Sequence, residues 1–516
     1  MTNKRIRRSD LNILVVGEGP SAISVAANLL PKTDLMAGVR FKVTMIDKLP
    51  RAVGGGPFGP GPRIHRCNQR SQTMGLSPNH PRAFRDWLEN RANANDFENE
   101  DLTHPPRQEF GIFLSDMLRK TRKEYAERGH KLESLVAEII NVDEGPDSVV
   151  ATTLEGEKLE FDSVVLTNGP SSSDQYTELL ESDNYFPSPY PTHALASKIP
   201  HEASVAIIGS SLTAIDAANG LAEQGHRGRI TLYSRTGRIP AVQAKGERYT
   251  PAVFTPESTK KLLEMEPLPL TALLPKLREE LEVATSFSSF DFDWMQKDNE
   301  SAVTFLRRTY HCSQLAQPYQ SVLRELYATY GEQIYRKLST ADKKFVKSSS
   351  LWKRFRHTMA RPTAKAFLNL LESGQVSVIR GLKSIEPAYK SFRVCCLDEQ
   401  QTTRIDEVDV VINATGASSN VPKLIEKGLA DPLICSLVEK GQVTPHPVGG
   451  IDAVYDRWNV IRSNGVASKR IYATGHLVSG TVFYVSGMDA IARLTDQLAQ
   501  ALIDDWLAIL RAIPGD

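Results

Sequence analysis

Two hydrophobic patterns alternate near the start of the chain. Residues 13–16 form a continuous apolar run, which is typical of a parallel strand buried on both faces. Apolar residues then recur with helical spacing over residues 23–30, and a second apolar run, residues 41–46, ends in Asp47. The pattern predicts a strand, a helix and a second strand, with a turn over residues 17–22 between the first two.

The turn has the residue spacing of a dinucleotide-binding fingerprint. Gly17 suits the tight turn, Gly19 lets the backbone approach a pyrophosphate, and Ala22 replaces the third glycine, where close helix–strand packing is needed. Pro20 and Ser21 open the helix, whose first N–H groups and positive dipole end favour phosphate. We therefore predict a dinucleotide site here. The alternative is a tight turn of an α/β protein with an empty site.

Asp47 is the expected acid of such a site. A carboxylate at the end of the second strand can accept hydrogen bonds from ribose hydroxyls, and Lys48 follows it directly. Both residues are predicted to bind the cofactor.

The same strand, turn, helix and strand return after a proline-rich stretch at residues 185–191, which we interpret as a linker. Residues 204–208 and 229–233 predict the two strands, and residues 215–223 predict the helix. A repeated unit of this kind implies two nucleotide sites. The second turn begins with Gly209, Ser210 and Ser211.

The second copy lacks the acid of the first. Its second strand ends in Ser234 and Arg235, with Arg238 close behind, and no carboxylate stands there. Arginine binds a 2′-phosphate through bidentate, charge-assisted hydrogen bonds. We predict that this site prefers NADP(H). The alternative is that Arg235 and Arg238 are a solvated surface pair.

The rest of the chain interrupts and then resumes the α/β pattern. Residues 251–375 are rich in helical spacing, including a predicted helix at 262–283, and indicate a helical insertion. Its basic stretch, residues 343–365, is best explained as a solvated helix face. Three further strands lead into turns at Gly169, Gly416 and Gly475, and these glycines are also predicted to bind a cofactor. An amphipathic helix over residues 488–510 closes the chain.

These elements predict an α/β fold with a Rossmann-like FAD-binding domain that is split in sequence. Residues 1–195 and 406–516 would form it, and residues 196–405 would form an inserted Rossmann-like NADPH-binding domain that carries the helical insertion at about 251–375.

The composition of the chain limits the classes of partner and the compartment that we expect. The chain has 62 Lys and Arg against 61 Asp and Glu, a net charge of +1, so no global field favours nucleic acid or a membrane surface. Five cysteines form no C-x-x-C or zinc pattern, which favours a reducing compartment and no bound metal. The basic residues 4–8 precede an apolar run already assigned to the first strand, so we expect a cytoplasmic protein rather than a secreted one.

With these motifs, the chain resembles the two-dinucleotide-domain FAD/NAD(P)-binding proteins, and among them those related to the N-hydroxylating and class B flavin monooxygenases. The matching segments are GEGPSA at 17–22, HRCNQ at 65–69, PRQEFGIFL at 106–114, GSSLTAIDA at 209–217, GHRGRITLYSRTGRIP at 225–240, WKRFRHTMA at 352–360, NATG at 413–416 and ATGHLVSG at 473–480. The resemblance implies FAD on the first unit, with Asp47 at the adenosine ribose, Asn68 near the flavin and Gly475 beside the ribityl–pyrophosphate region. His476 stands where many relatives carry Asp.

Two nucleotide sites in one chain suit hydride transfer from NADPH to a flavin. The resemblance implies an FAD- and NADPH-dependent monooxygenase, in which a flavin C4a-hydroperoxide transfers oxygen to a small-molecule nucleophile. An amine nitrogen is the favoured acceptor, which would make the reaction an N-hydroxylation. Asn68 and His476 are the candidate catalytic residues.

The expected partners are the substrate and molecular oxygen, and the hydrophobic last helix is compatible with a homo-oligomer. One alternative is an NADPH-dependent flavin dehydrogenase or reductase of a small organic acceptor. The other is a non-catalytic, redox-sensing flavoprotein scaffold.

Overall fold

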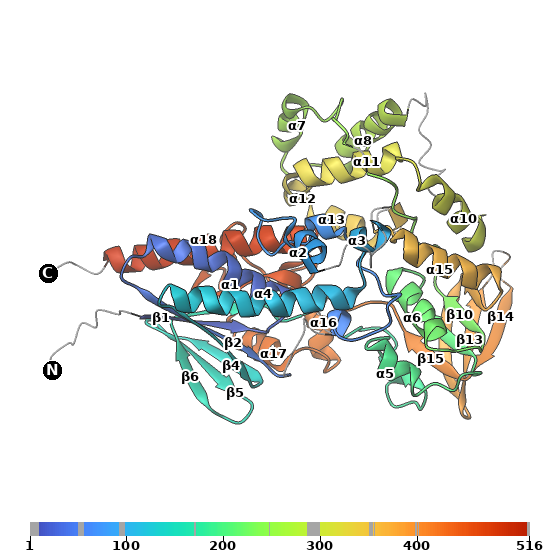
Figure 1. The fold of residues 1–516 in the computed structure, drawn as a ribbon, viewed down its shortest axis with the longest axis horizontal. Coiled ribbons are helices and arrows are strands. Elements are labelled where there is room, and N and C mark those ends of the chain that lie inside the picture. The colour runs from blue at the N-terminus through green and yellow to red at the C-terminus, as the bar shows by residue number, and fades with distance from the viewer. Residues whose placement is uncertain are drawn as a thin grey trace. The chain divides into compact units, whose positions relative to one another are not determined.

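The computed structural model describes residues 10–49, 56–91, 99–169, 172–246, 248–285, 300–349, 354–355, 357–397, 400 and 402–512. Part of the predicted motif at 352–360 and the basic residues 4–8 lie outside this set. The chain forms two compact units, and each is assembled from segments distant in sequence (Figure 1). The first consists of Met1–Gly59, Gln69–Ser171 and Ser418–Asp516, and the second of Pro60–Asn68 and Ser172–Ala417.

A six-stranded sheet forms the centre of the first unit. Its strands are β1 (Asp10–Val16), β2 (Arg40–Asp47), β3 (Lys131–Val136), β7 (Ser163–Leu166), β16 (Asn459–Ile461) and β17 (Ala467–Ala473). They lie in the order β16-β17-β7-β1-β2-β3, and all neighbours pair in parallel except β16 with β17. The predicted first strand is central, and its residues 13–16 are buried, as a strand covered on both faces requires.

Three long helices cover one face of this sheet: α1 (Pro20–Leu29), α4 (Arg107–Glu127) and α18 (Met488–Ala512), with α1 in contact with both of the others (Figure 1). The remaining elements of the unit are η1 (Leu30–Leu35), η2 (Gly56–Phe58), η3 (Ser71–Thr73), α2 (Ala83–Arg91), α3 (Asn99–Thr103), β4 (Ile139–Glu144), β5 (Val149–Thr153), β6 (Lys158–Phe161), α16 (Val421–Glu426), α17 (Pro432–Glu439) and η6 (Gly475–Val478). Strands β5 and β6 pair antiparallel.

A second, smaller parallel sheet lies in the second unit. Its strands are β8 (Tyr185–Phe186), β9 (Val205–Ile208), β10 (Ile230–Tyr233), β11 (Val376–Ile379) and β15 (Val410–Asn413), in the order β11-β10-β9-β15-β8. Helix α6 (Leu212–Glu223) follows β9 as predicted, and η4 (Thr177–Leu179) and α5 (Thr192–Ala196) precede it. An antiparallel sheet of β12 (Leu382–Ala388), β13 (Ser391–Leu397) and β14 (Thr403–Val408) completes the α/β part of the unit.

The chain passes between the compact units at 59/60, 68/69, 171/172 and 417/418, whereas the sequence predicted divisions at 195/196 and 405/406. Two strand pairings explain the difference. The stretch predicted as a linker begins with β8, which pairs with β15, and β15 in turn pairs with β9. Residues 172–195 and 406–417, which the sequence assigned to the FAD-binding domain, therefore belong to the second unit.

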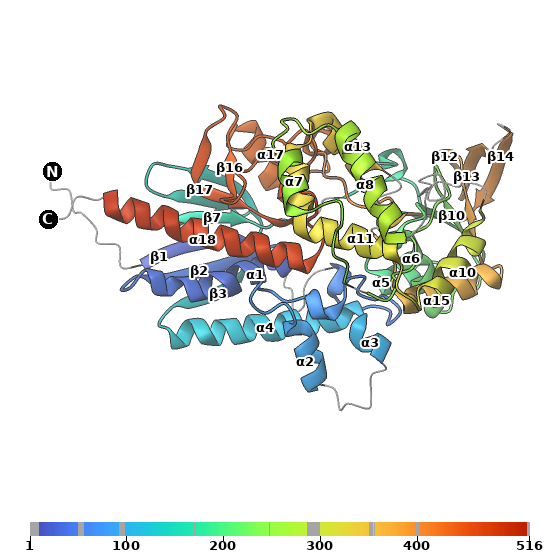
Figure 2. The same cartoon turned by 90° about the horizontal axis from the view of Figure 1, so that it is seen from above.

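The predicted helical insertion is present between β10 and β11. It contains α7 (Pro256–Leu263), α8 (Leu270–Thr285), α10 (Ala302–Cys312), α11 (Pro318–Leu326), η5 (Tyr327–Gly331), α12 (Glu332–Lys337), α13 (Thr340–Ser348) and α15 (Arg361–Glu372) (Figure 2). The single helix expected at 262–283 is wrong, because α7 ends before Pro267 and Pro269 and α8 begins after them. Proline lacks an N–H donor and restricts the residue before it, so the pair breaks the helix.

A buried carboxylate organises this insertion. Glu280 on α8 is fully buried and accepts hydrogen bonds from the Tyr249 hydroxyl and from the backbone N–H groups of Ala252, Val253 and Phe254. Burial alone would raise the pKa of the Glu280 carboxyl, but these hydrogen bonds outweigh it and hold the pKa below its usual range. The carboxylate thus joins the loop that enters the insertion to one of its central helices.

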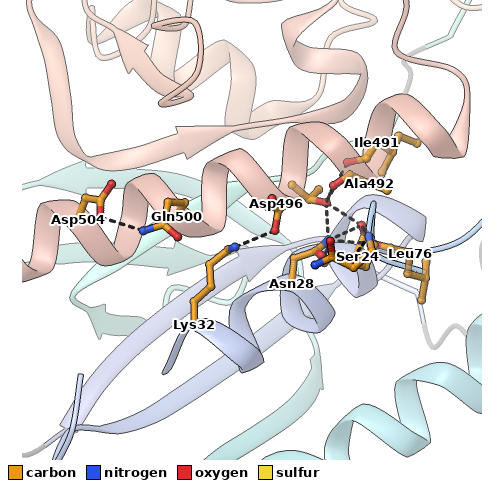
Figure 3. Close-up of polar contacts among 12 residues, drawn as sticks. Ser24, Asn28, Lys32, Leu76, Ile491, Ala492, Asp496, Gln500 and Asp504 are labelled. Atoms are coloured by element: carbon orange, nitrogen blue, oxygen red, sulfur yellow. Dashed lines mark hydrogen bonds and ion pairs between the residues drawn. The ribbon is translucent and has the colours of Figure 1, made fainter. Parts of the chain in front are cut away.

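The predicted C-terminal helix is confirmed as α18, and a buried polar network joins it to α1 (Figure 3). The Asn28 side-chain amide donates to the carbonyl oxygens of Ser24 and Leu76 at 3.0 and 2.8 Å, and to Thr495 Oγ1 at 3.0 Å. Ser24 Oγ lies 2.7 Å from Thr495 Oγ1.

Within the described ranges, no helix combines the length and apolarity that crossing a bilayer requires.

Replacing Asn28 by alanine is predicted to loosen the contact between α1 and α18. It removes two N–H donors that serve buried oxygens of Ser24, Leu76 and Thr495, so we expect the opening free energy of both helices to fall by about 2–3 kcal/mol. Hydrogen exchange of peptides from the two helices measures this. Gln500→Ala is the control, because Gln500 makes its hydrogen bond with Asp504 at the surface of α18 (Figure 3). Equal protection in the two variants would contradict the prediction.

Candidate functional site

The first predicted turn has the backbone geometry that its glycines suggested. Gly17 has φ +110°, and its N–H donates to the carbonyl oxygen of Ile46 at 2.7 Å. A Cβ at Gly17 would lie 2.8 Å from Thr167 Oγ1. By contrast, a Cβ at Gly19 would have no neighbour within 4 Å, so the backbone there faces open space. Gly17 is needed for the turn itself, and Gly19 leaves room for a ligand.

Helix α1 starts at this open side. Gly19 is its N-cap, Pro20 is its first residue, and no side chain caps the first turn, which also lacks acidic residues. Ala22 is fully buried, which allows the close packing predicted for this position. The turn after β17 approaches from the other side, because a Cβ at Gly475 would lie 2.8 Å from Ser21 Oγ. The uncapped N–H groups and the two glycine turns together make a site suited to phosphate.

Asp47 ends β2 beside the turn. Its carboxylate accepts the backbone N–H of Glu18 at 3.0 Å and that of Leu49 at 3.2 Å. The predicted ribose acid is therefore held rigidly at the expected strand end. Lys48, also predicted to bind the cofactor, pairs instead with Glu138 at 3.2 Å on an exposed surface.

Apolar side chains beside Asp47 were not identified from the sequence. Val136 is opposite Asp47 in the pairing of β2 with β3 and is 63% exposed, and Leu49 is 55% exposed. Leu135 is also exposed. Exposed apolar residues next to the carboxylate predicted to bind ribose suit a flat heteroaromatic base. The sequence does not indicate them, because the polar and apolar residues of β3 do not alternate regularly as in a typical strand.

The other candidates of the first sheet lie in two of its turns. Gly169 is exposed after β7, and His476 is half-buried in η6, next to Gly475. Both turns follow strands that end at the same edge as β1, since β17, β7 and β1 run in parallel.

Asn68 is half-buried and is the last residue of the segment Pro60–Asn68, which belongs to the second unit. Its neighbour Gln69 belongs to the first unit. Gln69 accepts the N–H of Met488 at 2.8 Å and donates to Asp489 at 2.9 Å, so it holds the start of α18. Asn68 is therefore followed directly by a residue whose side chain is hydrogen-bonded to the start of α18.

The second turn repeats the geometry of the first. Gly209 has φ +116°, and its N–H donates to the carbonyl oxygen of Tyr233 at 2.7 Å. A Cβ at Gly209 would lie 2.9 Å from the carbonyl oxygen of Ala414. Ser211 is the exposed N-cap of α6. Gly416, with φ +87°, follows β15 and so lies at this edge of the second sheet.

The polar loop after β10 is held together by serines. Ser210 Oγ is 2.9 Å from Ser234 Oγ and donates to the carbonyl oxygen of Arg238 at 2.7 Å. Ser234 Oγ also accepts the N–H of Gly237 at 2.9 Å. These hydrogen bonds give Ser210 and Ser234 a role in shaping the loop that carries the predicted arginines.

A third arginine joins this loop. Arg235 is exposed, Arg238 is half-buried, and Arg380 follows the neighbouring strand β11. A Cβ at Gly237 would lie 2.9 Å from Arg380 Cβ, and the N–H of Gly381 donates to the carbonyl oxygen of Arg235 at 3.3 Å. The sequence could not identify Arg380, because the whole helical insertion separates β10 from its partner β11.

His65 has a structural environment. Its Nε2 lies 2.9 Å from the carbonyl oxygen of Asp216 on α6, and the Tyr190 hydroxyl donates to Asp216 Oδ2 at 2.8 Å. All three residues belong to the second unit. Among the described residues, no group of three or more His, Cys, Asp or Glu side chains could hold a metal ion.

Comparisons with known proteins concern the fold and part of the sequence. Residues 14–171 match the FAD-NAD(P)-binding family model. No curated protein sequence matches the chain. Solved structures match almost the whole chain at low identity. The reduced form of ornithine hydroxylase from Pseudomonas aeruginosa is 16% identical, with 96% of this chain and 99% of that one covered and a TM-score of 0.55.

Two further structures give the same result. L-lysine 6-monooxygenase from Pseudomonas syringae is 15% identical, covers 96% of this chain and 99% of its own, and has a TM-score of 0.53. The FAD-bound cadaverine monooxygenase of Erwinia amylovora is 12% identical, with 95% and 94% covered and a TM-score of 0.51. The predicted α/β fold, with two Rossmann-like dinucleotide-binding domains, is confirmed.

The two glycines of the first turn are predicted to respond differently to alanine. Gly17→Ala places a Cβ against Thr167 at a positive φ, so we expect the melting temperature to fall by several degrees. Gly19→Ala meets no protein atom and should melt like the wild type without ligand. It should, however, lose most of the stabilisation that added FAD gives, because the new methyl group occupies the ligand's space. Thermal unfolding with and without FAD tests both. The same melting temperature and the same stabilisation by FAD in both variants would contradict the prediction.

Proposed function

We propose that the protein is an FAD- and NADPH-dependent monooxygenase that transfers an oxygen atom to the amine nitrogen of a small molecule, by way of an oxygenated flavin. The main support is the architecture, because ornithine, lysine and cadaverine hydroxylases share this fold over nearly the full length of both chains. Molecular oxygen would be the second substrate, and the cytoplasm the compartment.

The residues of the first unit fit FAD. Gly17, Gly19 and the uncapped start of α1 would hold the pyrophosphate, Asp47 the adenosine ribose, and the exposed side chain of Val136 the adenine. Gly475 would close the site from the strand β17. When bound, FAD supplies the hydride acceptance and oxygen activation that side chains cannot perform.

The residues of the second unit fit NADPH. Gly209 and the start of α6 would bind its pyrophosphate, and Arg235, Arg238 and Arg380 would bind its 2′-phosphate. The described part of this strand end has no counterpart of Asp47, since residues 234–238 contain no carboxylate. That absence favours the phosphorylated nucleotide, because a carboxylate there would repel the phosphate.

The protein's own contribution to the reaction would be binding, orientation and exclusion of water. Asn68 would orient the flavin through its side-chain amide, and half-buried His476 would contact it from the turn at Gly475. The role of His476 is proposed from its place next to Gly475, and that of Asn68 from the resemblance carried by residues 65–69.

The experiment is anaerobic reduction of the FAD-loaded protein with NADPH, followed by rapid mixing with oxygenated buffer. We expect NADPH to reduce the flavin, and oxygen to give a transient spectrum that belongs to neither oxidised nor reduced flavin. Amines such as ornithine, lysine and cadaverine should shorten its lifetime and yield hydroxylamine in proportion to the NADPH consumed.

Three outcomes would contradict the proposal. Direct return to oxidised flavin with release of hydrogen peroxide, and anaerobic turnover with an organic acceptor, would indicate a dehydrogenase or reductase. Flavin that NADPH does not reduce would indicate a redox-sensing scaffold.

The arginine loop is predicted to determine the choice between NADPH and NADH. Arg380→Met and Arg235→Met should each lower kcat/KM for NADPH about 10- to 100-fold, since each removes charge-assisted hydrogen bonds to the 2′-phosphate. The value for NADH should change less than threefold. Arg227→Met is the control, because Arg227 precedes β10 at the opposite edge of the sheet. An equal fall in kcat/KM for NADPH and NADH would indicate instead that the arginines are needed for folding.

A further inference from the structure

The phosphate-binding turn of the first unit contains a carboxylate of its own. Glu18 lies between Gly17 and Gly19, and its side chain is only 12% exposed. The site proposed for the pyrophosphate therefore has a negative group in its wall, where the sequence pattern allows any residue.

A second carboxylate, that of Asp47, contacts the backbone of the same turn. Asp47 Oδ2 accepts the backbone N–H of Glu18 at 3.0 Å. A dinucleotide would add the two negative charges of its pyrophosphate to these two carboxylates. Charges that are shielded from water interact more strongly than they would in bulk solvent, so this turn needs a compensating cation.

Arg122 is such a cation. It projects from α4, which packs along α1 (Figure 1). One of its guanidinium nitrogens lies 3.3 Å from Glu18 Oε1 and also donates to Ser134 Oγ on β3. Ser134 Oγ in turn donates to the same Glu18 oxygen at 2.5 Å. The Glu18 carboxylate is thus held toward α4 and β3 by two donors. Lys48, which follows Asp47 directly in the sequence, pairs with Glu138 instead.

The pair is poorly placed to stabilise the fold. The Arg122 side chain is 40% exposed, and ion pairs with a partner this exposed contribute little to folding. The ion pair has more effect on a phosphate ligand at the turn, because the Glu18 charge would repel that ligand if Arg122 did not neutralise it.

We infer that Arg122 is a positioning residue for the FAD pyrophosphate, which acts by neutralising Glu18 and holding its carboxylate away from the phosphate-binding backbone. Ser134 holds the same carboxylate from β3. This inference rests on the proposed function in one respect, the binding of FAD to the first unit. It makes FAD affinity depend on three residues from three separate elements, of which only Glu18 lies in the fingerprint.

The test is the dissociation constant for FAD, measured on the full-length apoprotein by quenching of flavin fluorescence. We expect Arg122→Met to bind FAD at least tenfold more weakly than the wild type, and Arg122→Lys to recover part of the loss. Glu18→Gln should bind at least as tightly as the wild type. The double variant Glu18→Gln, Arg122→Met should return to within about threefold of the wild type, because the charge that needed neutralising is gone.

Arg119→Met is the matched control. Arg119 lies on the same helix, but it is strongly exposed and pairs with Asp116. Its removal should leave FAD affinity unchanged. The loss in Arg122→Met should also shrink as salt increases, which a loss of packing would not do.

Two results would overturn the inference while leaving the proposed function intact. One is a double variant as weak as Arg122→Met, which would assign Arg122 to packing. The other is an Arg122→Met variant that binds FAD like Arg119→Met. A wild-type chain that binds no FAD would overturn both the inference and the proposed function.

Discussion

Both halves of the molecule depend on one backbone arrangement. In each unit a glycine with a strongly positive φ follows the first strand and donates its N–H to a carbonyl oxygen at the end of the next strand, at 2.7 Å in both cases. Side chains with a Cβ are excluded there by sterics and by the neighbouring strand turn. This hydrogen bond sets the angle at which the helix leaves the sheet, and it presents the helix N-terminus to a phosphate.

On this shared scaffold, the two sites differ in the charge at the end of the second strand. Asp47 is held by the turn of the first unit, whereas the second unit gathers Arg235, Arg238 and Arg380 at the equivalent edge. Opposite charges at equivalent positions suit two different nucleotides, one with free ribose hydroxyls and one with a 2′-phosphate. A chain that binds both can pass a hydride from one to the other, which is the physical basis of the proposed activity.

The sequence was most informative where the chemistry is local. The turns at Gly17 and Gly209 could be predicted because tight geometry permits few residues, and the strand end at Asp47 follows directly from them. Arg380 and Arg122 could not, since each reaches its site through a strand or helix neighbour far away in the sequence. The same limit explains the boundaries, because the pairing of β8 with β15 joins segments that no local pattern connects. The break near Pro267 is different, because the apolar spacing continues across it and only the prolines indicate that the helix ends.

The central claim is that one chain has two separate nucleotide sites with different preferences. Titration calorimetry of the FAD-loaded protein with NADP⁺ tests it most directly, together with the flavin content of the same sample. The account predicts one FAD for each chain and one further equivalent of NADP⁺ bound without release of flavin, with much weaker binding of NAD⁺. Displacement of FAD by NADP⁺, or the absence of a second binding event, would contradict it.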